Sequence, residues 1–586
     1  MKQFMISLAL ILTLFGLLIF PEPDHAFAAQ KETADPTEFI VTSTQDAIDA
    51  NIGDGICAAS NGACTLRAAI QEGTAFSLAT IRFNIPGSGP HIIYIFTTVL
   101  PNVYNNIHGP NMGNNAEIVI DGTNNGTPLN RGLYVYNDGK SIKGLTVQNF
   151  SRTAIGAAGN NTQIGGTAAQ EANVLCNVTY GIEDNVDTTG TVIYGNYIGV
   201  RKNGTTCHNT YGIAISGKNT IIGGSASGQR NIIGGNDTGI YIRNYAENTT
   251  IKGNFIGLGP TGTSVVPNTI HGILIAGGTT GSVSTNTVIG GTGANEGNYI
   301  AGNGTTGIRI NFGSVGTIIQ GNRIGLNIFE SAHLPNGMGI YVNSSNVTIG
   351  GSAAAANWSL DRIELNRDTA TSEISNITIS DNYIGLTPSF IYRTTSDLDG
   401  IKIFQAYDTL IQRNYISHFN TGVNVHQAGG YGHKIIRNRI WDNTGLGIDL
   451  GNDGVTLNDN LDADLGPNDY QNFPVITGFT NTSNVFLTIS GTLHSAPNRA
   501  YNIYLYSNPA CDENGYGEGR YFLHNVAANT DASGNATWTS NIITMNNLQG
   551  ICYTAQAEEA VNLGSASEFS KGFLAGWQIF LPMMKR

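Results

Sequence analysis

Charged residues are scarce in this chain of 586 residues, because Asp, Glu, Lys and Arg together make up only 12% of it. A typical soluble domain carries roughly 25%. The balance is acidic, with 29 Lys and Arg against 42 Asp and Glu and a net charge of −13. There is no basic block, so nucleic acid is not an expected partner. So little charge also argues against a long coiled coil and against charge-driven disorder.

Several motifs that carry chemistry are missing as well. No Cys-x-x-Cys spacing occurs, which argues against metal binding by the cysteines. There is no Gly-x-Ser-x-Gly elbow, no His-Glu-x-x-His helix and no phosphate loop. After the first segment, no apolar run of about 20 residues follows, so no later membrane span is expected.

The first segment has the features of an export signal. Lys2 precedes an apolar run, Phe4–Phe20, and the small-residue site Ala26-Phe27-Ala28 follows. This pattern predicts a secretory signal peptide at residues 1–28; an uncleaved membrane anchor is the alternative. Six cysteines suit an oxidising compartment, so we expect an extracellular protein, secreted or held at the cell surface.

The six cysteines form three sequence-local pairs, and six cysteines allow fifteen pairings. The middle pair has further support, since its two members each lie five residues before a Gly-Ile dipeptide. Equivalent positions on stacked coils would lie about 4.8 Å apart, within disulfide reach. The expected pairs are Cys57 with Cys64, Cys176 with Cys207, and Cys511 with Cys552.

Glycine is abundant, at 75 residues, and much of it belongs to a long repeat. An Ile-Gly-Gly turn begins at Ile164, Ile222, Ile289 and Ile349, and a Gly/Asp-Asn-x-Ile-Gly motif begins at Gly195, Gly253, Gly321 and Asp381. Both series advance in steps of about 60 residues. A Gly-Ile motif recurs about twice per step, with one degenerate coil expected near residues 364–379. One coil per 22–35 residues predicts a β-solenoid, with the motif asparagines stacked as a ladder in a turn. A string of β-sandwiches and a propeller are the alternatives.

These repeats, such as Asn-Tyr-Ile-Gly and Gly-Ile-Tyr-Ile, resemble bacterial right-handed parallel β-helix repeat proteins over residues 115–455. The resemblance implies an all-β fold, a three-sided right-handed parallel β-helix with inward Ile, Val and Leu. We expect this β-helix at residues 87–455.

A cap is expected before the β-helix, at residues 29–86, because end coils expose an apolar face. Residues 65–72 predict a short helix. The stretch from Gly53 to Ile70 resembles the CSLREA-type domain that precedes such β-helices. Cys64-Thr65-Leu66-Arg67 follows its motif, whereas Ala68 stands where the family has Glu. No activity follows from that domain.

After the repeats come an acidic linker, residues 456–473, a region of alternating strands, residues 474–576, and a tail, residues 577–586. Asp459, Asp462 and Asp464 in the linker offer oxygen ligands that suit Ca²⁺, the only cofactor that we expect; a solvated turn is the alternative. The strand region predicts a C-terminal β-sandwich and resembles the module that often follows these β-helices, with a hairpin loop at residues 531–535. The tail is a sorting signal, a last strand or a loose end.

Outward positions after each Gly-Ile are the candidate site. Tyr241, Arg309 and Tyr341 could line a groove for sugars; a solvated face is the alternative. Candidate catalytic residues lie on the last coils, where a base, an acid and a cation site could support proton abstraction or hydrolysis. They are Asp397, Asp399, Lys402, His426 and Asp449.

Asp397-Leu398-Asp399-Gly400 distantly resembles a polygalacturonase strand, and Tyr431-Gly432-His433-Lys434 resembles the Gly-His-Gly turn of that family, but its intervening Asp-Asp pair is missing. We therefore expect a secreted or cell-surface, non-catalytic protein for adhesion, glycan contact or envelope structure, with polysaccharide or cell-surface glycans as partners. The alternative is an extracellular polysaccharide lyase or glycoside hydrolase that acts on an acidic polysaccharide.

Overall fold

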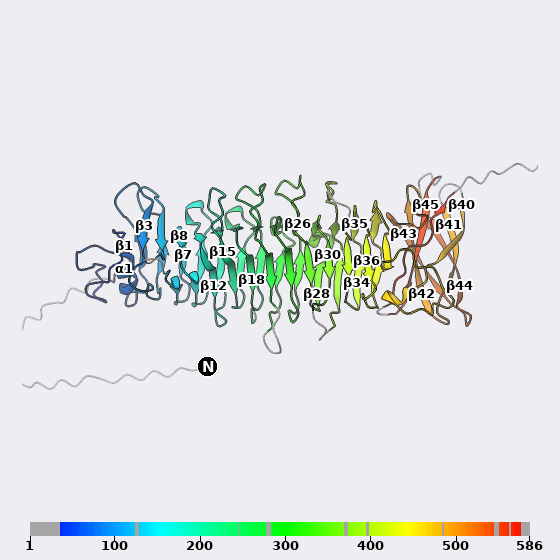
Figure 1. Ribbon diagram of the computed structural model, residues 1–586, viewed down its shortest axis with the longest axis horizontal. Coiled ribbons are helices and arrows are strands. Elements are labelled where there is room, and N and C mark those ends of the chain that lie inside the picture. The colour runs from blue at the N-terminus through cyan, green and yellow to red at the C-terminus, as the bar shows by residue number, and fades with distance from the viewer. Residues whose placement is uncertain are drawn as a thin grey trace, which may run out of the picture.

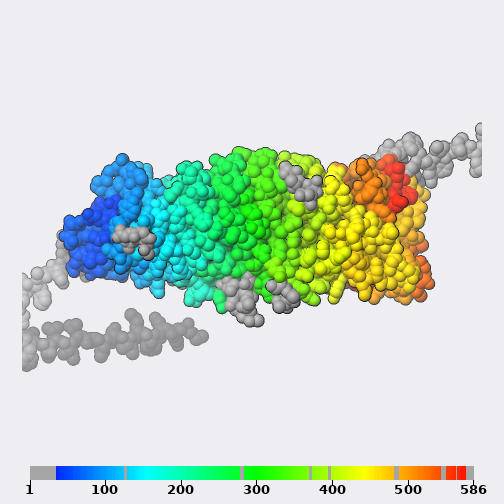
Figure 2. Space-filling model, in the orientation of Figure 1, coloured from blue at the N-terminus to red at the C-terminus, as the bar shows by residue number. Residues whose placement is uncertain are grey.

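A computed structural model describes residues 35–123, 128–243, 245–276, 283–368, 373–393, 398–482, 486–543, 550–561 and 564–575. The chain forms a rod of parallel strands, closed at one end by two antiparallel sheets (Figures 1 and 2). The expected signal peptide, the tail and Asp397 lie outside the described residues. No helix in the described part of the chain is long and apolar enough to cross a membrane.

From the third coil onward, each coil of the rod contributes one strand to each of three long parallel sheets, so the structure is a parallel β-helix. Sheet A contains β1 (Glu38–Val41), β2 (Thr80–Phe83), β4 (Asn106–His108), β7 (Ser141–Lys143), β10 (Gln163–Gly165), β13 (Val192–Tyr194), β16 (Ile221–Gly223), β19 (Thr250–Lys252), β22 (Val288–Gly290), β25 (Ile318–Gln320), β28 (Val347–Gly350), β31 (Ile377–Ser380), β34 (Thr409–Gln412) and β37 (Lys434–Ile436).

Sheet B follows sheet A in every coil after the first. It contains β3 (His91–Tyr94), β5 (Ile118–Asp121), β8 (Leu145–Gln148), β11 (Val174–Cys176), β14 (Tyr197–Ile198), β17 (Ile232–Ile233), β20 (Phe255–Ile256), β23 (Tyr299–Ile300), β26 (Arg323–Ile324), β29 (Trp358–Ser359), β32 (Tyr383–Ile384), β35 (Tyr415–Ser417) and β38 (Arg439–Trp441).

Sheet C carries the Gly-Ile motif. It contains β6 (Arg131–Val135), β9 (Thr153–Ala157), β12 (Val178–Asp184), β15 (Asn209–Ile215), β18 (Thr238–Ile242), β21 (His271–Ile275), β24 (Thr306–Ile310), β27 (Ile340–Val342), β30 (Ile363–Leu365), β33 (Ile401–Ile403), β36 (Val423–His426) and β39 (Ile448–Gly451). Strand β30 belongs to the degenerate coil that the repeat spacing predicts.

The repeat residues account for the packing inside the rod. Ile213, Ile240 and Ile273 stack in register on neighbouring strands of sheet C, and all three are fully buried. The glycine before each isoleucine is required by close backbone approach. A Cβ atom at Gly212 would lie 2.5 Å from the carbonyl oxygen of Gly239. The motif therefore selects residues that bring successive coils into contact.

The asparagines of the repeat form the predicted ladder in the turn between sheets A and B. Each Nδ2 donates to the Oδ1 of the next asparagine at 2.9–3.0 Å. Its members are Asn173, Asn196, Asn231, Asn254, Asn298, Asn322, Asn357, Asn382, Asn414 and Asn438. A second ladder between sheets B and C runs from Asn209 to Asn336 and ends on Asp361. Buried turn backbone is thereby hydrogen-bonded throughout.

The N-terminal end of the rod is covered by helix α1 (Leu66–Glu72), which confirms the predicted helix. Thr65 caps it, with its hydroxyl accepting from the Ala68 backbone N–H at 3.1 Å. Strands β1 and β2, from the segment expected as a cap, already pair in sheet A. Three disulfides with Cα atoms 5.0–5.1 Å apart join Cys57 to Cys64, Cys176 to Cys207 and Cys511 to Cys552.

The C-terminal β-sandwich has two antiparallel sheets. They contain β40 (Val475–Thr482), β41 (Phe486–His494) and β44 (Asn535–Ile543) in one, and β42 (Ala500–Asn508), β43 (Tyr521–Asn529), β45 (Cys552–Glu559) and β46 (Phe573–Leu574) in the other. The hairpin predicted at residues 531–535 is wrong. That turn joins β43 to β44, which lie in different sheets, so the chain crosses from one layer to the other.

Short 3-10 helices occupy some of the connections. They are η1 (Ala169–Glu171), η2 (Ser227–Gln229) and η3 (Ala353–Ala355), which lie between sheets A and B, and η4 (Pro467–Tyr470) in the linker.

Candidate functional site

The candidate catalytic residues on sheet C lie in a packed polar column. The strand register places Lys402, Asn424 and Asp449 on successive coils. Asn424 donates to Asp399 Oδ2 at 3.0 Å, and burial raises the pKa of Asp399, which Lys402 opposes. Asn424 is fully buried and Asp449 is only 8% exposed. The column therefore offers little carboxylate surface to a substrate.

His426 lies in the neighbouring outward column of sheet C. Its ring centroid is 4.5 Å from that of Phe404, and its Nδ1 accepts from the Ala428 backbone N–H at 3.4 Å. The imidazole is thus two positions along the strand from the Lys402–Asp449 column rather than in it.

The three residues predicted to face a glycan also lie on sheet C, but only one stands in an aromatic stack. Tyr241 lies 4.9 Å from Tyr211, measured between ring centroids. Tyr341 is only 5% exposed, because the guanidinium of Arg309 lies 4.4 Å above its ring. Arg309 and the Tyr341 hydroxyl both bind Asp368. These three side chains bind one another and leave little of the Tyr341 ring accessible to a sugar.

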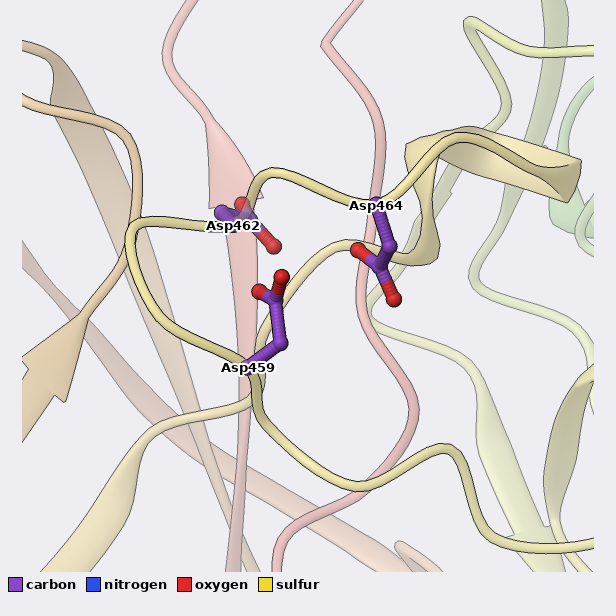
Figure 3. Close-up of side chains that lie close together, drawn as sticks. All are labelled: Asp459, Asp462 and Asp464. Carbon is purple, nitrogen blue, oxygen red and sulfur yellow. The ribbon is translucent and has the colours of Figure 1, made fainter.

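The three linker aspartates come together at the junction with the sandwich (Figure 3). Each offers a carboxylate oxygen within 4.8 Å of the others. Asp462 accepts from the Asn472 backbone N–H at 2.8 Å and from the Ser495 hydroxyl at 2.5 Å. Burial raises the pKa of Asp462 to about 6, and Asp464 and Asp459 add to the shift. The cluster can hold a cation, although Asp462 also has a structural role.

Sequence reasoning missed a candidate binding face, which is the outward side of sheet B. Its register-paired positions form one column along the rod, with aromatic rings and arginines on most coils. In order they are Tyr197, Ile232, Phe255, Tyr299, Arg323, Trp358, Tyr383, Tyr415 and Arg439. The signal was present in the repeat, since each is the variable residue that follows a ladder asparagine.

The column is partly exposed at Tyr197, closed over the next two coils, and open again along its C-terminal part. Ile232 and Phe255 are buried against Leu258 and Val266 of a connecting loop. From Tyr299 onward, every member of the column is partly exposed. We call this open part the sheet B groove, from Tyr299 to Arg439.

Two hollows lie along the sheet B groove. The first, of about 320 Å³, is lined by Tyr299, Arg323 and Trp358 among others, and the Arg323 guanidinium lies 4.0 Å from the Trp358 ring. The second, of about 410 Å³, is lined by Tyr383 and Tyr415, whose rings stack at 4.6 Å. Ala353 of η3 borders both hollows, so they lie next to each other along the rod.

Comparisons with known proteins agree with the fold. A family model described as a right-handed beta helix region matches residues 326–461, and the β-helix is right-handed. No curated protein matches the chain.

Among solved structures, the chain is similar to the enzymatically active domain of tailspike protein 2 of bacteriophage CBA120. The two are 10% identical, with a TM-score of 0.30 over 87% of this chain and 74% of that one. A second similar structure is ORF18 of Geobacillus virus E2, with 10% identity and a TM-score of 0.20 over 92% of this chain and 76% of that one. Likenesses this limited carry no activity over to this chain.

Proposed function

We propose that this protein is a secreted or cell-surface rod that binds a polysaccharide chain along the sheet B groove without cleaving it. The observation that carries the proposal is the row of half-exposed aromatic and arginine side chains on consecutive coils. Binding sites combine apolar and aromatic surface with a few polar groups, and the rings of this row add apolar area beside its arginines. A row that repeats at the coil spacing suits a polymer better than a compact ligand.

Export is part of the proposal. The apolar run and Ala-x-Ala site at the N-terminus support it, and so do three disulfides, which persist in oxidising compartments.

The segment from 29 to 86 is proposed as a CSLREA-type cap. In support of this, Arg67 forms an ion pair with Asp46 at 2.6 Å and donates to the Thr98 carbonyl at 2.7 Å. Glu72 accepts from the backbone N–H groups of Gly53 and Gly55 at 2.6 and 2.9 Å. The segment is therefore tied together by its own polar side chains, without a glutamate at Ala68.

The packing of sheet C supports a role without catalysis. A general acid or base must reach the proton that it transfers. Asp449 and Asn424 are nearly or fully buried, and Tyr341 is covered by Arg309. A lyase or hydrolase that uses this column would need a substrate to displace those contacts.

The test is retention of the purified protein on a panel of immobilised polysaccharides, compared with a Tyr383→Ala/Tyr415→Ala variant. Losing two stacked rings removes about 1 kcal/mol for each ring beyond their buried area, so we expect affinity to fall at least about tenfold. The control is Tyr180→Ala/Tyr211→Ala, which removes a similar stack, 5.3 Å between ring centroids, from sheet C.

Equal loss in both variants, or in neither, would contradict the sheet B groove as the binding site. Release of reducing ends or unsaturated products would contradict the non-catalytic role and support the lyase or hydrolase.

A further inference from the structure

The second hollow of the sheet B groove lies where the β-helix meets the sandwich. Tyr383 and Tyr415 belong to the β-helix, whereas Phe522 comes from strand β43 of the sandwich. Three arginines also line it: Arg413, Arg437 and Arg439. We call this hollow the seam groove.

The seam groove concentrates positive charge in an acidic protein. Arginine supplies three of its eight lining residues, although the whole chain has only 29 Lys and Arg in 586 residues. Asp381 is the one acidic residue in the lining, and it is paired with Arg413 through two hydrogen bonds of 2.8 Å. Among the described residues, no carboxylate lies within 4.0 Å of the guanidinium of Arg437 or Arg439. Two positive charges in the seam groove are therefore left without a counterion.

Arg437 is held in place by the sandwich. Its backbone N–H donates to the Tyr506 hydroxyl at 3.0 Å, and its guanidinium donates to Asn525 Oδ1 at 3.2 Å. The same guanidinium lies 5.6 Å from the centre of the Phe522 ring. A side chain fixed in this way loses less conformational entropy on binding a ligand.

The backbone at two of these arginines departs from the glycine of the motif. In the first three motifs the position before the ladder asparagine is glycine, with φ between +67° and +69°. The last two coils place Arg413 and Arg437 there, both at φ +54°. Left-handed backbone is unfavourable for a residue with a long side chain. Glycine would suit this turn, and the two arginines instead supply side chains that line the seam groove, where Arg413 pairs with Asp381 and Arg437 donates to Asn525.

We infer that the seam groove binds an anionic sugar residue of the polysaccharide, with Arg437 and Arg439 contacting its negative group and Tyr383 and Tyr415 its ring. This inference rests on the proposed function and names its ligand class. Arginine forms paired, charge-assisted hydrogen bonds to carboxylate and oxyanion groups, which suits uronate and sulfated sugars alike.

Two substitutions test this with residues that the repeat itself uses. Arg437→Gly introduces the glycine that the motif has at this position. Arg439→Tyr makes residues 438–440 read Asn-Tyr-Ile, as in the motif. Neither should lower the melting temperature by more than a few degrees, since glycine relieves the left-handed strain and tyrosine stacks well on Tyr415. Arg499→Gln is the control for each single substitution, because it removes one positive charge from the exposed surface of the sandwich.

The probes are two pairs that differ only in charge: polygalacturonate with its fully methyl-esterified form, and dextran sulfate with dextran. We expect the wild type and Arg499→Gln to bind the charged member at least tenfold more tightly at 0.15 M NaCl, and much less so at 1 M. The double variant should lose that preference. Which of the two pairs shows the preference distinguishes carboxylate from sulfate.

Equal binding of charged and neutral polymers by the wild type would overturn the anionic ligand and leave the proposed function standing. A preference that persists in the double variant would place the charge recognition outside the seam groove. Failure to bind any of the polymers, together with no binding to the polysaccharide panel, would instead remove the proposed function itself.

Discussion

The ladder asparagines show how one residue type can hold a long rod together. Asn254 is fully buried, and its Nδ2 donates to the Ile222 carbonyl at 2.9 Å and to Asn298 Oδ1 at 3.0 Å. Its Oδ1 accepts from the backbone N–H and the Nδ2 of Asn231. One side chain thus satisfies buried groups on the coils before and after it, which no apolar residue could do.

Replacing Asn254 by Ala is expected to destabilise the protein by about 3 kcal/mol, because the partners on both neighbouring coils lose their hydrogen bonds inside the rod. Urea unfolding followed by circular dichroism measures the effect. The control is Asn248→Gly, at an exposed asparagine with φ +55° whose Nδ2 donates to Asn219 at 3.1 Å. Glycine suits that backbone, so a change of less than about 0.5 kcal/mol is expected there. Similar losses at both sites would mean that the ladder gives no special stability.

At the scale of elements, the sandwich takes the place of the next coil. Asn443 donates to Glu518 Oε1 through its backbone N–H at 3.1 Å and its Nδ2 at 2.7 Å, the pattern that each ladder asparagine makes with its successor. Glu568 accepts from the Leu450 and Thr456 backbone N–H groups at 2.8 and 3.1 Å. Tyr506 and Phe569 of the sandwich join the core of the rod. The sandwich therefore covers the apolar end of the solenoid.

These carboxyl groups make the junction sensitive to pH. Burial raises the pKa of Glu518 from 4.5 to about 7 and that of Glu568 to about 8. Because each pKa is higher in the folded state, the stabilising contribution is complete below about pH 4.5 and is lost as the pH rises through 7 and 8. We expect the free energy of unfolding to fall by on the order of 3 kcal/mol between about pH 6.5 and 9.

Thermal unfolding at several pH values measures this loss, and Glu518→Gln/Glu568→Gln is the matched variant. Glutamine keeps an acceptor oxygen but does not ionise, so its unfolding profile should be flat over that range. Asp184 and Asp462, whose pKa values are raised to about 6, titrate mainly below it. An unchanged slope in the variant would assign the effect to other groups.

Calcium is expected to stabilise the linker. At neutral pH three carboxylates lie close together, and a divalent cation would offset their repulsion. Millimolar Ca²⁺ should therefore raise the melting temperature relative to EDTA. Asp464→Asn should abolish the increase, because Asp464 Oδ1 is buried without a hydrogen-bond partner among the described residues and its loss leaves the Asp462 bonds intact. Asp453→Asn, an exposed aspartate nearby, is the control, and equal melting temperatures with and without Ca²⁺ would exclude the site.

The repeat predicted the coils and the ladder, because their glycines, isoleucines and asparagines are fixed by backbone contacts. It did not predict which outward face is open. Tyr341 has the same motif position as Tyr241, yet Arg309 from the preceding coil covers it. The sheet B groove was overlooked because the residue at this motif position varies from Ile to Trp. The sequence does not show which of these residues are exposed. The turn at residues 531–535 has a sequence typical of a hairpin. Whether the next strand pairs in the same sheet or crosses to the other depends on packing between the sheets, which the turn sequence does not encode.

For the whole molecule, the outward faces of sheets B and C differ in how much surface they offer to a ligand. The outward column of sheet C is largely packed, with Ala214 and Asn424 fully buried. The sheet B groove is hollowed over six coils, from β23 to β38. At about 4.8 Å per coil, it extends for about 24 Å. In a chain of net charge −13, the local excess of arginine favours attraction of an anionic polymer to the seam groove.

A ligand that reaches both hollows should bind more tightly than one that reaches only one, because the second contact becomes intramolecular. We expect affinity for oligosaccharides of a bound polymer to rise steeply with length until they span about 24 Å, and to level off beyond it. Trp358→Ala removes a large ring from the first hollow and only an edge-on contact, 6.5 Å between ring centroids, from Tyr383 of the second. It should abolish the rise while short oligosaccharides still bind in the seam groove. Isothermal titration calorimetry over a length series measures both quantities. Affinity that is independent of oligosaccharide length in the wild type would show that a single hollow binds the ligand. The binding surface would then not extend along the rod.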